Sequence, residues 1–191
     1  MQTDFQNGSK KDLSISLAAA NLYAIPLIII PFIIFGIPYY LIWGEKNLRI
    51  GRIGLKEMLI IIAVFISGAV IHELIHGIFW IKSGKKTWDK IKFGFHFKTF
   101  TPYIHCTEPI NAGAYKMGTA APGIILGVIP SVFSIILGNI WLFWFGMLFS
   151  ISAGGDFIVL WILRKVDFSA LVEDHHSRAG CFVYENKTGT K

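Results

Sequence analysis

The chain has 191 residues, of which 53% are hydrophobic and 16% are charged, and its mean hydropathy is +0.56. These values exclude an ordinary soluble domain and indicate an integral membrane protein. The net charge of +6 would suggest a nucleic-acid partner in a soluble protein. Here, however, most lysines and arginines stand beside or between apolar runs, where they orient the protein and contact anionic lipid. We therefore expect a lipid bilayer, and no nucleic acid, as a partner.

Four apolar runs are long enough to cross a bilayer of about 30 Å as helices. They cover approximately residues 13–43, 55–81, 117–137 and 140–163. Prolines inside the first and third runs predict kinks or separate short helices. The pair Gly138-Asn139 predicts a tight turn between the third and fourth runs. The expected fold class is an all-α integral membrane bundle of about four transmembrane helices.

The polar ends of the chain indicate its orientation. Residues 1–12 and 164–191 are expected to be tails, and the first of them lacks the cleavage pattern of a removable signal peptide. With four spans, both tails and the loop 82–116 lie on one side, which carries fourteen of the eighteen lysines and arginines. Because positive charge concentrates on the inner side, we expect both termini in the cytoplasm.

The second apolar run contains the sequence VIHELIHGIFW, which places three polar side chains, His72, Glu73 and His76, in an otherwise apolar helix. Positions i and i+4 of a helix lie on one face, so His72 and His76 can meet one metal ion. In this arrangement the two histidines bind Zn²⁺ and Glu73 acts as the general base. A buried carboxylate in a membrane span is costly and is usually retained for function. The alternative is that the histidines only hydrogen-bond neighbouring helices and Glu73 is protonated.

A catalytic zinc ion usually has three protein ligands, and Asp156 is the best candidate for the third. It is the only other ionisable side chain well inside a long apolar run. If the fourth run leaves the bilayer near Arg164, Asp156 lies roughly 12 Å inside it. His72 and His76 lie roughly 15 and 9 Å before Lys82 on the same side, so the depths agree. The alternative for Asp156 is a neutral or lysine-paired contact between helices.

The loop after the second run shows the period of a β-strand. Apolar side chains at Ile91, Phe93, Phe95 and Phe97 alternate with lysine, glycine and histidine. This alternation predicts a short β-like hairpin at the membrane surface or at the bundle entrance. Phe93, Phe95 and Phe97 are then candidates for binding an extended substrate by edge pairing. An equally good alternative is a hairpin that anchors the loop to lipid.

A second cluster of ligand types, His105, Cys106 and Glu108, occurs in the loop sequence YIHCTEP. His105 or Cys106 could supply a different third ligand, or a partner that orients a zinc-bound imidazole. A purely structural role is the more common one for such a pair. Cys181 is the only other cysteine. A bridge between Cys106 and Cys181 would have to join the loop to the tail, so we expect free thiols.

Several of these motifs together resemble a known family. HELIHG, YIHCTEP, the third-run sequence AAPGIILGVIP and SAGGD look like a bacterial family of zincin peptidases of unknown function. More broadly, they are similar to the site-2 protease type of intramembrane zinc metalloprotease. The resemblance covers about residues 71–160. It implies that His72, His76 and Asp156 bind the metal, that Glu73 is the catalytic carboxylate, and that the protein resides in a bacterial cell membrane.

The sequence therefore predicts a transmembrane metalloprotease domain over residues 13–163. We expect one Zn²⁺ per chain and a membrane-protein or peptide substrate. The main alternative is a membrane zinc-binding protein that transports or senses metal, but such a protein has no specific need for Glu73. A transporter would also be expected to show repeated halves, and none is visible in the sequence. A third possibility is an inactive protease-like scaffold. The sequence gives no oligomeric state.

Overall fold

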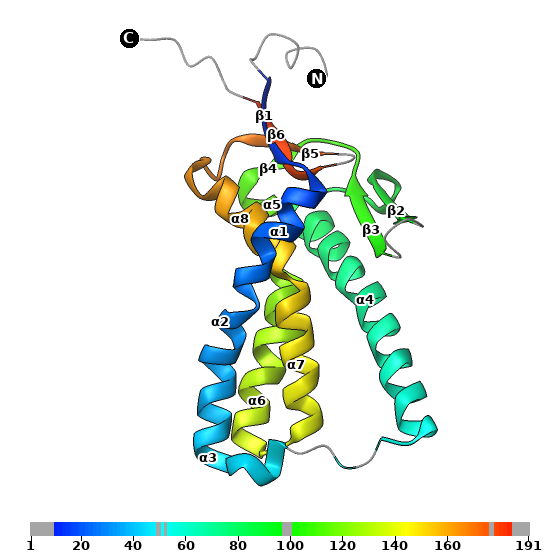
Figure 1. The fold of residues 1–191 in the computed structure, drawn as a ribbon. Helices are drawn as coiled ribbons and strands as arrows, with labels where there is room; N and C mark the ends of the chain where they lie inside the picture. The colour runs from blue at the N-terminus through cyan, green and yellow to red at the C-terminus, as the bar shows by residue number, and fades with distance from the viewer. Residues whose placement is uncertain (1–9, 49–50, 52, 97–100, 176–177, 185–191) are drawn as a thin grey trace.

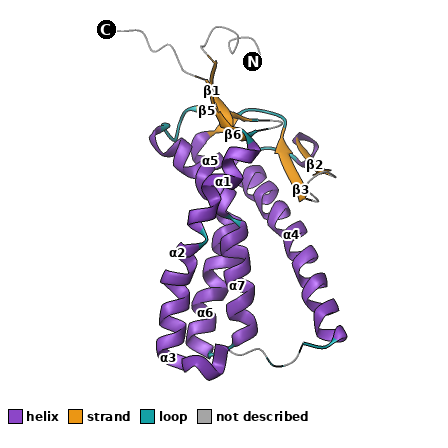
Figure 2. Ribbon diagram, in the orientation of Figure 1, coloured by secondary structure: helices purple, strands orange, loops and turns teal. Residues whose placement is uncertain are grey.

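The computed structural model of the protein describes residues 10–48, 51, 53–96, 101–175 and 178–184. The helices form an elongated bundle, and the strands gather at one end of it (Figures 1 and 2). Three helices are long and apolar enough to cross a membrane: Leu17–Glu45, Leu55–Gly84 and Ala112–Leu137. A bent pair, Ile140–Ser152 with Gly154–Lys165, makes a fourth if it counts as one span. This result agrees with the expected helical architecture of about four spans.

The first span stays helical through its prolines. It consists of α1 (Leu17–Leu27), α2 (Ile29–Pro31), a π-helical turn (Phe32–Gly36) and α3 (Ile37–Leu48). The hydroxyl of Ser16 caps α1 by accepting a hydrogen bond from the Ala19 amide. The π turn follows Pro31 directly, and the wider turn accommodates a residue that cannot donate a helical hydrogen bond. The sequence predicted a kink here, and the structure contains a local change of helical pitch.

The third span is built in the same way. It consists of α5 (Ala112–Pro122), a second π-helical turn (Gly123–Val128) and α6 (Ile129–Leu137). Gly138 ends α6 with a φ of 66°, which L side chains avoid. The chain then turns into α7 (Ile140–Ser152), whose first turn is capped by the side chain of Asn139. The structure therefore contains the predicted tight turn.

The fourth span is bent by 41° where the sequence predicted one continuous run. The break lies at Ala153, between α7 and α8 (Gly154–Ile162). A 3-10 turn, Leu163–Lys165, follows α8. The bend lies within SAGG, residues 152–155, a run of small residues in which two glycines lower the helix propensity. Its consequence is that Asp156 stands in the first turn of a new helix.

The second span, α4 (Leu55–Gly84), is the longest helix of the chain's described part. A 3-10 turn, Trp88–Lys90, leads from it into the antiparallel hairpin of β2 (Ile91–His96) and β3 (Thr101–Cys106). The predicted hairpin is thus present. Strand β3 packs along α4, whereas β2 lies on the outer side. Phe93 and Phe95 are exposed at 51% and 41%, and Phe97 falls outside the described residues.

A four-stranded antiparallel sheet joins the two ends of the described chain, where the sequence predicted only tails. Its strands are β1 (Lys10–Ile15), β4 (Ile110–Asn111), β5 (Leu171–Asp174) and β6 (Ala179–Tyr184), in the order β1-β6-β5-β4. The fold is therefore not all-α. The sheet places both described ends beside the C-terminal end of α4. The two described ends, Lys10 and Tyr184, are paired in this sheet, while the cytoplasmic location of the termini stays a prediction.

The main apolar core lies under this sheet, between α4, α5 and α8. Its buried members include Trp80, Tyr115, Leu163 and both cysteines. Cys106 and Cys181 are free thiols, as expected. Burial raises the pKa of the Cys181 thiol to about 12, so the side chain remains a neutral core residue.

Candidate metal centre

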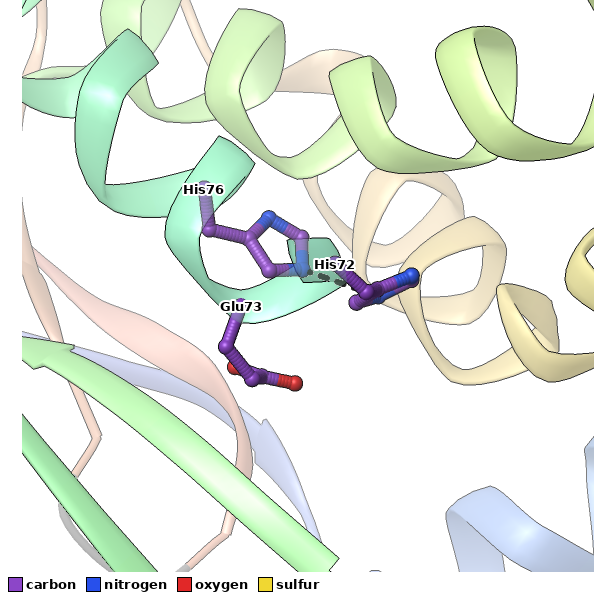
Figure 3. A group of neighbouring side chains, drawn as sticks. All are labelled: His72, Glu73 and His76. Atoms are coloured by element: carbon purple, nitrogen blue, oxygen red, sulfur yellow. Dashed lines mark hydrogen bonds between the residues drawn. The ribbon is translucent and has the colours of Figure 1, made fainter. Parts of the chain in front are cut away.

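His72, Glu73 and His76 project from α4, with Glu73 beside a strand and the two imidazole rings directed away from the strands toward the neighbouring helices (Figure 3). The two imidazole rings stand edge to face with their centroids 4.9 Å apart. Their Nε2 atoms are separated by 3.2 Å. Potential ligand atoms of all three residues lie within 4.8 Å of one another. The helical spacing therefore has the effect expected from the sequence: it presents two imidazoles to one point and a carboxylate beside them.

Asp156 approaches the same point from α8. Its Oδ2 lies 3.1 Å from Nε2 of His72, and its Oδ1 lies 3.4 Å from Nε2 of His76. Two ligand atoms bound about 2.0–2.1 Å from a tetrahedral zinc ion would stand about 3.3–3.4 Å apart. The observed separations of 3.1–3.4 Å, which involve a different oxygen of Asp156 for each histidine, are therefore close to those around one tetrahedral metal ion. The role of Asp156 as a ligand stays a prediction.

The surroundings of these atoms also suit a cation. Nδ1 of His76 lies 2.9 Å from the carbonyl oxygen of Gly118. Because a carbonyl can only accept, we assign the proton to Nδ1, which leaves the lone pair of Nε2 facing Asp156. Oδ2 of Asp156 is buried, and Nε2 of His72, 3.1 Å away, is not aligned with it as a hydrogen-bond donor. A buried carboxylate oxygen without a donor is costly, and a metal ion would satisfy it.

Glycines bring the elements of the centre close together. A Cβ on Gly118 of α5 would overlap the indole of Trp80 on α4. A Cβ on Gly77 of α4 would stand 2.5 Å from the Ile104 side chain of β3. Small residues of this kind let helix backbones approach in a membrane. The indole of Trp80 also stacks on Tyr115, with centroids 5.4 Å apart and an interplanar angle of 6°. This packing fixes the second half of α4, and with it the two histidines.

A cavity of about 300 Å³ opens beside the centre. Glu73, His76 and Asp156 line it, and β3 contributes Ile104 and His105. The backbone of Ile104 lies beside the Glu73 carboxylate. Residues of α1 and of the β5–β6 region complete the wall. The cavity therefore lies between the membrane helices and the sheet at the polar end of the bundle.

The second predicted cluster forms separate contacts. Nδ1 of His105 lies 2.9 Å from Oδ2 of Asp174, whose other oxygen accepts a hydrogen bond from the Tyr115 hydroxyl at 2.8 Å. The Cys106 thiol donates to the carbonyl oxygen of Glu108. His105 lines the same cavity as the metal-binding residues, and Asp174 of β5 holds its ring in place. Sequence reasoning missed Asp174 and Tyr115, since neither belongs to a recognisable motif.

Glu108 forms ion pairs at the edge of the loop. Its carboxylate lies 2.8 Å from Nζ of Lys86 and 3.0 Å from Nζ of Lys90. Hydrogen bonds from these two lysines hold the pKa of Glu108 below its usual value. The structure thus gives Glu108 a tethering role in the loop, and gives Cys106 a buried place in the core. Any part of either residue in metal chemistry stays a prediction.

A family model described as "Putative zincin peptidase" matches residues 65–171, which is more than half of the chain. The matched segment contains His72, Glu73, His76 and Asp156 together with the hairpin and α5. The searches of curated proteins and of solved structures found no match. The similarity to site-2 proteases therefore stays a resemblance of motifs.

Proposed function

We propose that this chain, which belongs to the putative zincin peptidase family, is a membrane-embedded zinc metalloprotease. It would hydrolyse peptide bonds of membrane-protein substrates in or near the bilayer. One observation carries the proposal: donor atoms of His72, His76 and Asp156 converge at 3.1–3.4 Å beside the Glu73 carboxylate. A structural cluster of histidines would not require a third residue at zinc-ligand separation, nor a further carboxylate at the same point.

The roles of the side chains follow from their chemistry. His72, His76 and Asp156 would hold one Zn²⁺ per chain, and the Gly118 carbonyl would fix the ring of His76. The bound metal would supply Lewis acidity for activating water and polarising the substrate carbonyl. Three protein ligands leave a fourth position open, as catalytic rather than structural zinc sites do. Deprotonated Asp156 also suits its place in the first turn of α8, where the helix dipole favours negative charge.

Glu73 performs the proton transfers of hydrolysis. Its carboxylate takes a proton from the water molecule whose oxygen forms the new bond to the carbonyl carbon. It then returns that proton to the leaving amine as the C–N bond breaks. The Ile104 backbone of β3 lies beside the Glu73 carboxylate and is placed to orient it. A carboxylate that moves a proton twice in this way cannot be replaced by an amide of the same shape.

The position of the centre along α4 supports catalysis in or near the membrane. His76 lies eight residues before the end of α4 at Gly84, or roughly 12 Å along the helix axis. Apolar residues precede the centre over several turns, whereas the cavity opens among polar groups of the sheet and loop. Water can reach the cavity from that polar end. A peptide in extended form could lie beside the hairpin, for which Phe93 and Phe95 offer exposed apolar side chains.

Replacement of Glu73 by glutamine tests the proposal. Purified wild type should contain about one zinc per chain by mass spectrometry. It should also cleave members of a panel of labelled single-span peptides in vesicles. Glu73→Gln should keep the zinc and lose cleavage by at least about 100-fold, the lower bound of a general-base contribution. The matched control is Asp89→Asn, a carboxylate-to-amide change at an exposed site. Equal cleavage by wild type and Glu73→Gln would contradict the proposal.

A further inference from the structure

A basic pocket and an apolar groove meet where the first span, α8 and the sheet come together (Figure 1). The basic pocket has a volume of about 740 Å³ and lies at the polar end of the bundle. The apolar groove has a volume of about 750 Å³ and lies between the first span and α8. Ile162, the last residue of α8, lines both of them. The pocket and the groove are therefore continuous at this side chain.

The basic pocket carries more positive than negative charge. Its cations are Lys11 of β1 and the pair Arg164-Lys165, which follows α8. Neither lysine forms an ion pair with any residue in the described part of the chain. Asp167 is the one acid among the described lining residues, and the amide and hydroxyl groups of Ser169 donate hydrogen bonds to its carboxylate. The pocket therefore suits an anion such as a phosphate group.

The apolar groove extends along the first span for about the depth of one bilayer leaflet. Tyr23 and Ile34 line its two ends and are eleven residues apart, or roughly 17 Å along the helix axis. One leaflet contributes about 15 Å to a hydrocarbon core of about 30 Å. Phe157 and Trp161 stand on the α8 wall, and Trp161 is 67% exposed, as tryptophans at a membrane interface commonly are. The wall on the first span follows one helical face through Tyr23, Leu27, Ile30 and Ile34.

Both walls change from basic to apolar in the same direction. On β1, the alternate residues Lys11, Leu13 and Ile15 share one face of the strand. The first two line the pocket and the third lines the groove. On the other wall, Arg164 lines the pocket and Trp161, three residues earlier, lines the groove. Cζ of Arg164 lies 4.2 Å from the centroid of the Trp161 ring, and its Nη1 donates to the Trp161 carbonyl oxygen at 2.7 Å, so the cation is held at the junction.

We propose that the pocket and the groove together bind one anionic phospholipid. Its phosphate lies among Lys11, Arg164 and Lys165, and one of its acyl chains lies in the groove. A phospholipid has the same order of chemistry as both walls, and basic pockets beside membrane helices bind anionic headgroups. The Arg164 guanidinium keeps further N–H donors for the phosphate beyond the one that Trp161 accepts. The lipid site is separate from the metal centre, because Asp156 points from another face of α8 to the histidines of α4.

Native mass spectrometry of the purified full chain in detergent tests the inference, because it counts bound lipid without requiring cleavage. The probes are phosphatidylglycerol, which is anionic, phosphatidylcholine, which is zwitterionic, and inorganic phosphate. The site predicts one phosphatidylglycerol per chain, bound at least about tenfold more tightly than phosphatidylcholine. Inorganic phosphate, which has no acyl chain, should not displace it. Equal affinity for the two lipids would overturn the inference, since a lipid that merely coats the helices needs no particular headgroup.

Removal of charge tests the headgroup pocket. Lys11→Gln/Lys165→Gln should bind phosphatidylglycerol about tenfold more weakly, because it lacks two cations that face the phosphate. The matched control is Lys82→Gln/Lys92→Gln, which removes two exposed lysines at the same end of the bundle but outside the pocket. It should bind the lipid as wild type does. Equal loss of binding in both double variants would overturn the inference, because it would show attraction by overall charge.

Filling the groove tests the acyl-chain site independently of charge. Ile34→Trp places a larger side chain where the end of the acyl chain would lie, so phosphatidylglycerol should bind about fivefold more weakly or worse. Ile136→Trp is the matched control, since Ile136 is 64% exposed on α6 outside the groove, and it should bind as wild type does. Unchanged binding in Ile34→Trp would overturn the inference. Displacement of the lipid by inorganic phosphate would also overturn it, and would indicate a site for soluble phosphate.

Discussion

The two halves of α4 have the same helical backbone but very different surroundings. In the first half, Leu59 and Ile66 are 56% and 57% exposed. In the second half, Ile75 and Trp80 are 9% and 4% exposed, and α5 and β3 pack against them. The same helix is thus open where it is purely apolar and enclosed where it carries His72, Glu73 and His76. Tight packing therefore occurs along the half of α4 that must hold the histidines and Glu73 in position. The other half needs only an apolar environment.

Truncation of one side chain in each half gives the largest expected contrast. Trp80→Ala should lower the free energy of unfolding by about 3–5 kcal/mol, because it removes a buried ring stacked on Tyr115. Ile66→Ala should change it by less than about 1 kcal/mol, since an exposed side chain loses few protein contacts. Thermal unfolding of both variants in detergent measures the difference. Equal destabilisation would show that the first half of α4 is packed as tightly as the second.

Added methyl groups give a smaller contrast. Gly118→Ala should cost about 1–3 kcal/mol, because its Cβ overlaps the Trp80 indole at the crossing of α4 and α5. Gly155→Ala is the matched control, since a Cβ there meets no atom within 4 Å. It should be neutral or stabilise by up to about 1 kcal/mol through helix propensity. The same unfolding assay applies. Equal stability of Gly118→Ala and Gly155→Ala would contradict the claim that α4 and α5 pack too closely at Gly118 for a Cβ.

Acidification should produce the smallest effect, at the loop that follows α4. Lys86 and Lys90 lower the pKa of Glu108 from its usual 4.5, so the folded state holds this proton less tightly than the unfolded state. The contribution to stability is therefore complete above pH 4.5 and is lost as the pH falls through the lower folded value. Glu108→Gln should be slightly less stable than wild type at pH 7. The melting temperatures of wild type and Glu108→Gln should converge below pH 4.5. A difference between them that grows as the pH falls would contradict this prediction.

Much of the helical architecture could be predicted from the sequence because its signals are local. Apolar runs of sufficient length indicate spans, and the alternation from Ile91 to Phe95 indicates a strand, which the structure contains as β2. The spacing of His72 and His76 places two imidazoles on one face of any helix. The contact of Asp156 with both histidines could also be predicted, because the three residues lie at similar distances from the membrane end of their spans. A soluble protein offers no such measure of depth. Its function as a ligand remains to be measured.

The sheet could not be predicted, because its strands pair across almost the whole chain. Lys10 pairs with Tyr184, and Ile110 pairs with Val172. A short polar segment with weak alternation looks like a tail until a distant partner supplies its hydrogen bonds. The same long-range pairing brings Asp174 to His105. The bend at Ala153 was missed for a different reason, since hydropathy records length and polarity but not the direction of a helix axis.

A zinc-bound structure determined with anomalous scattering at the zinc edge tests the central claim most directly. The account predicts one zinc ion per chain, about 2.0–2.1 Å from Nε2 of His72 and of His76, with a carboxylate oxygen of Asp156 as the third protein ligand. Asp156→Ala should lose or strongly weaken this peak, whereas Asp89→Asn should keep it. A zinc peak at His105 or Cys106, or full zinc occupancy in Asp156→Ala, would contradict the account.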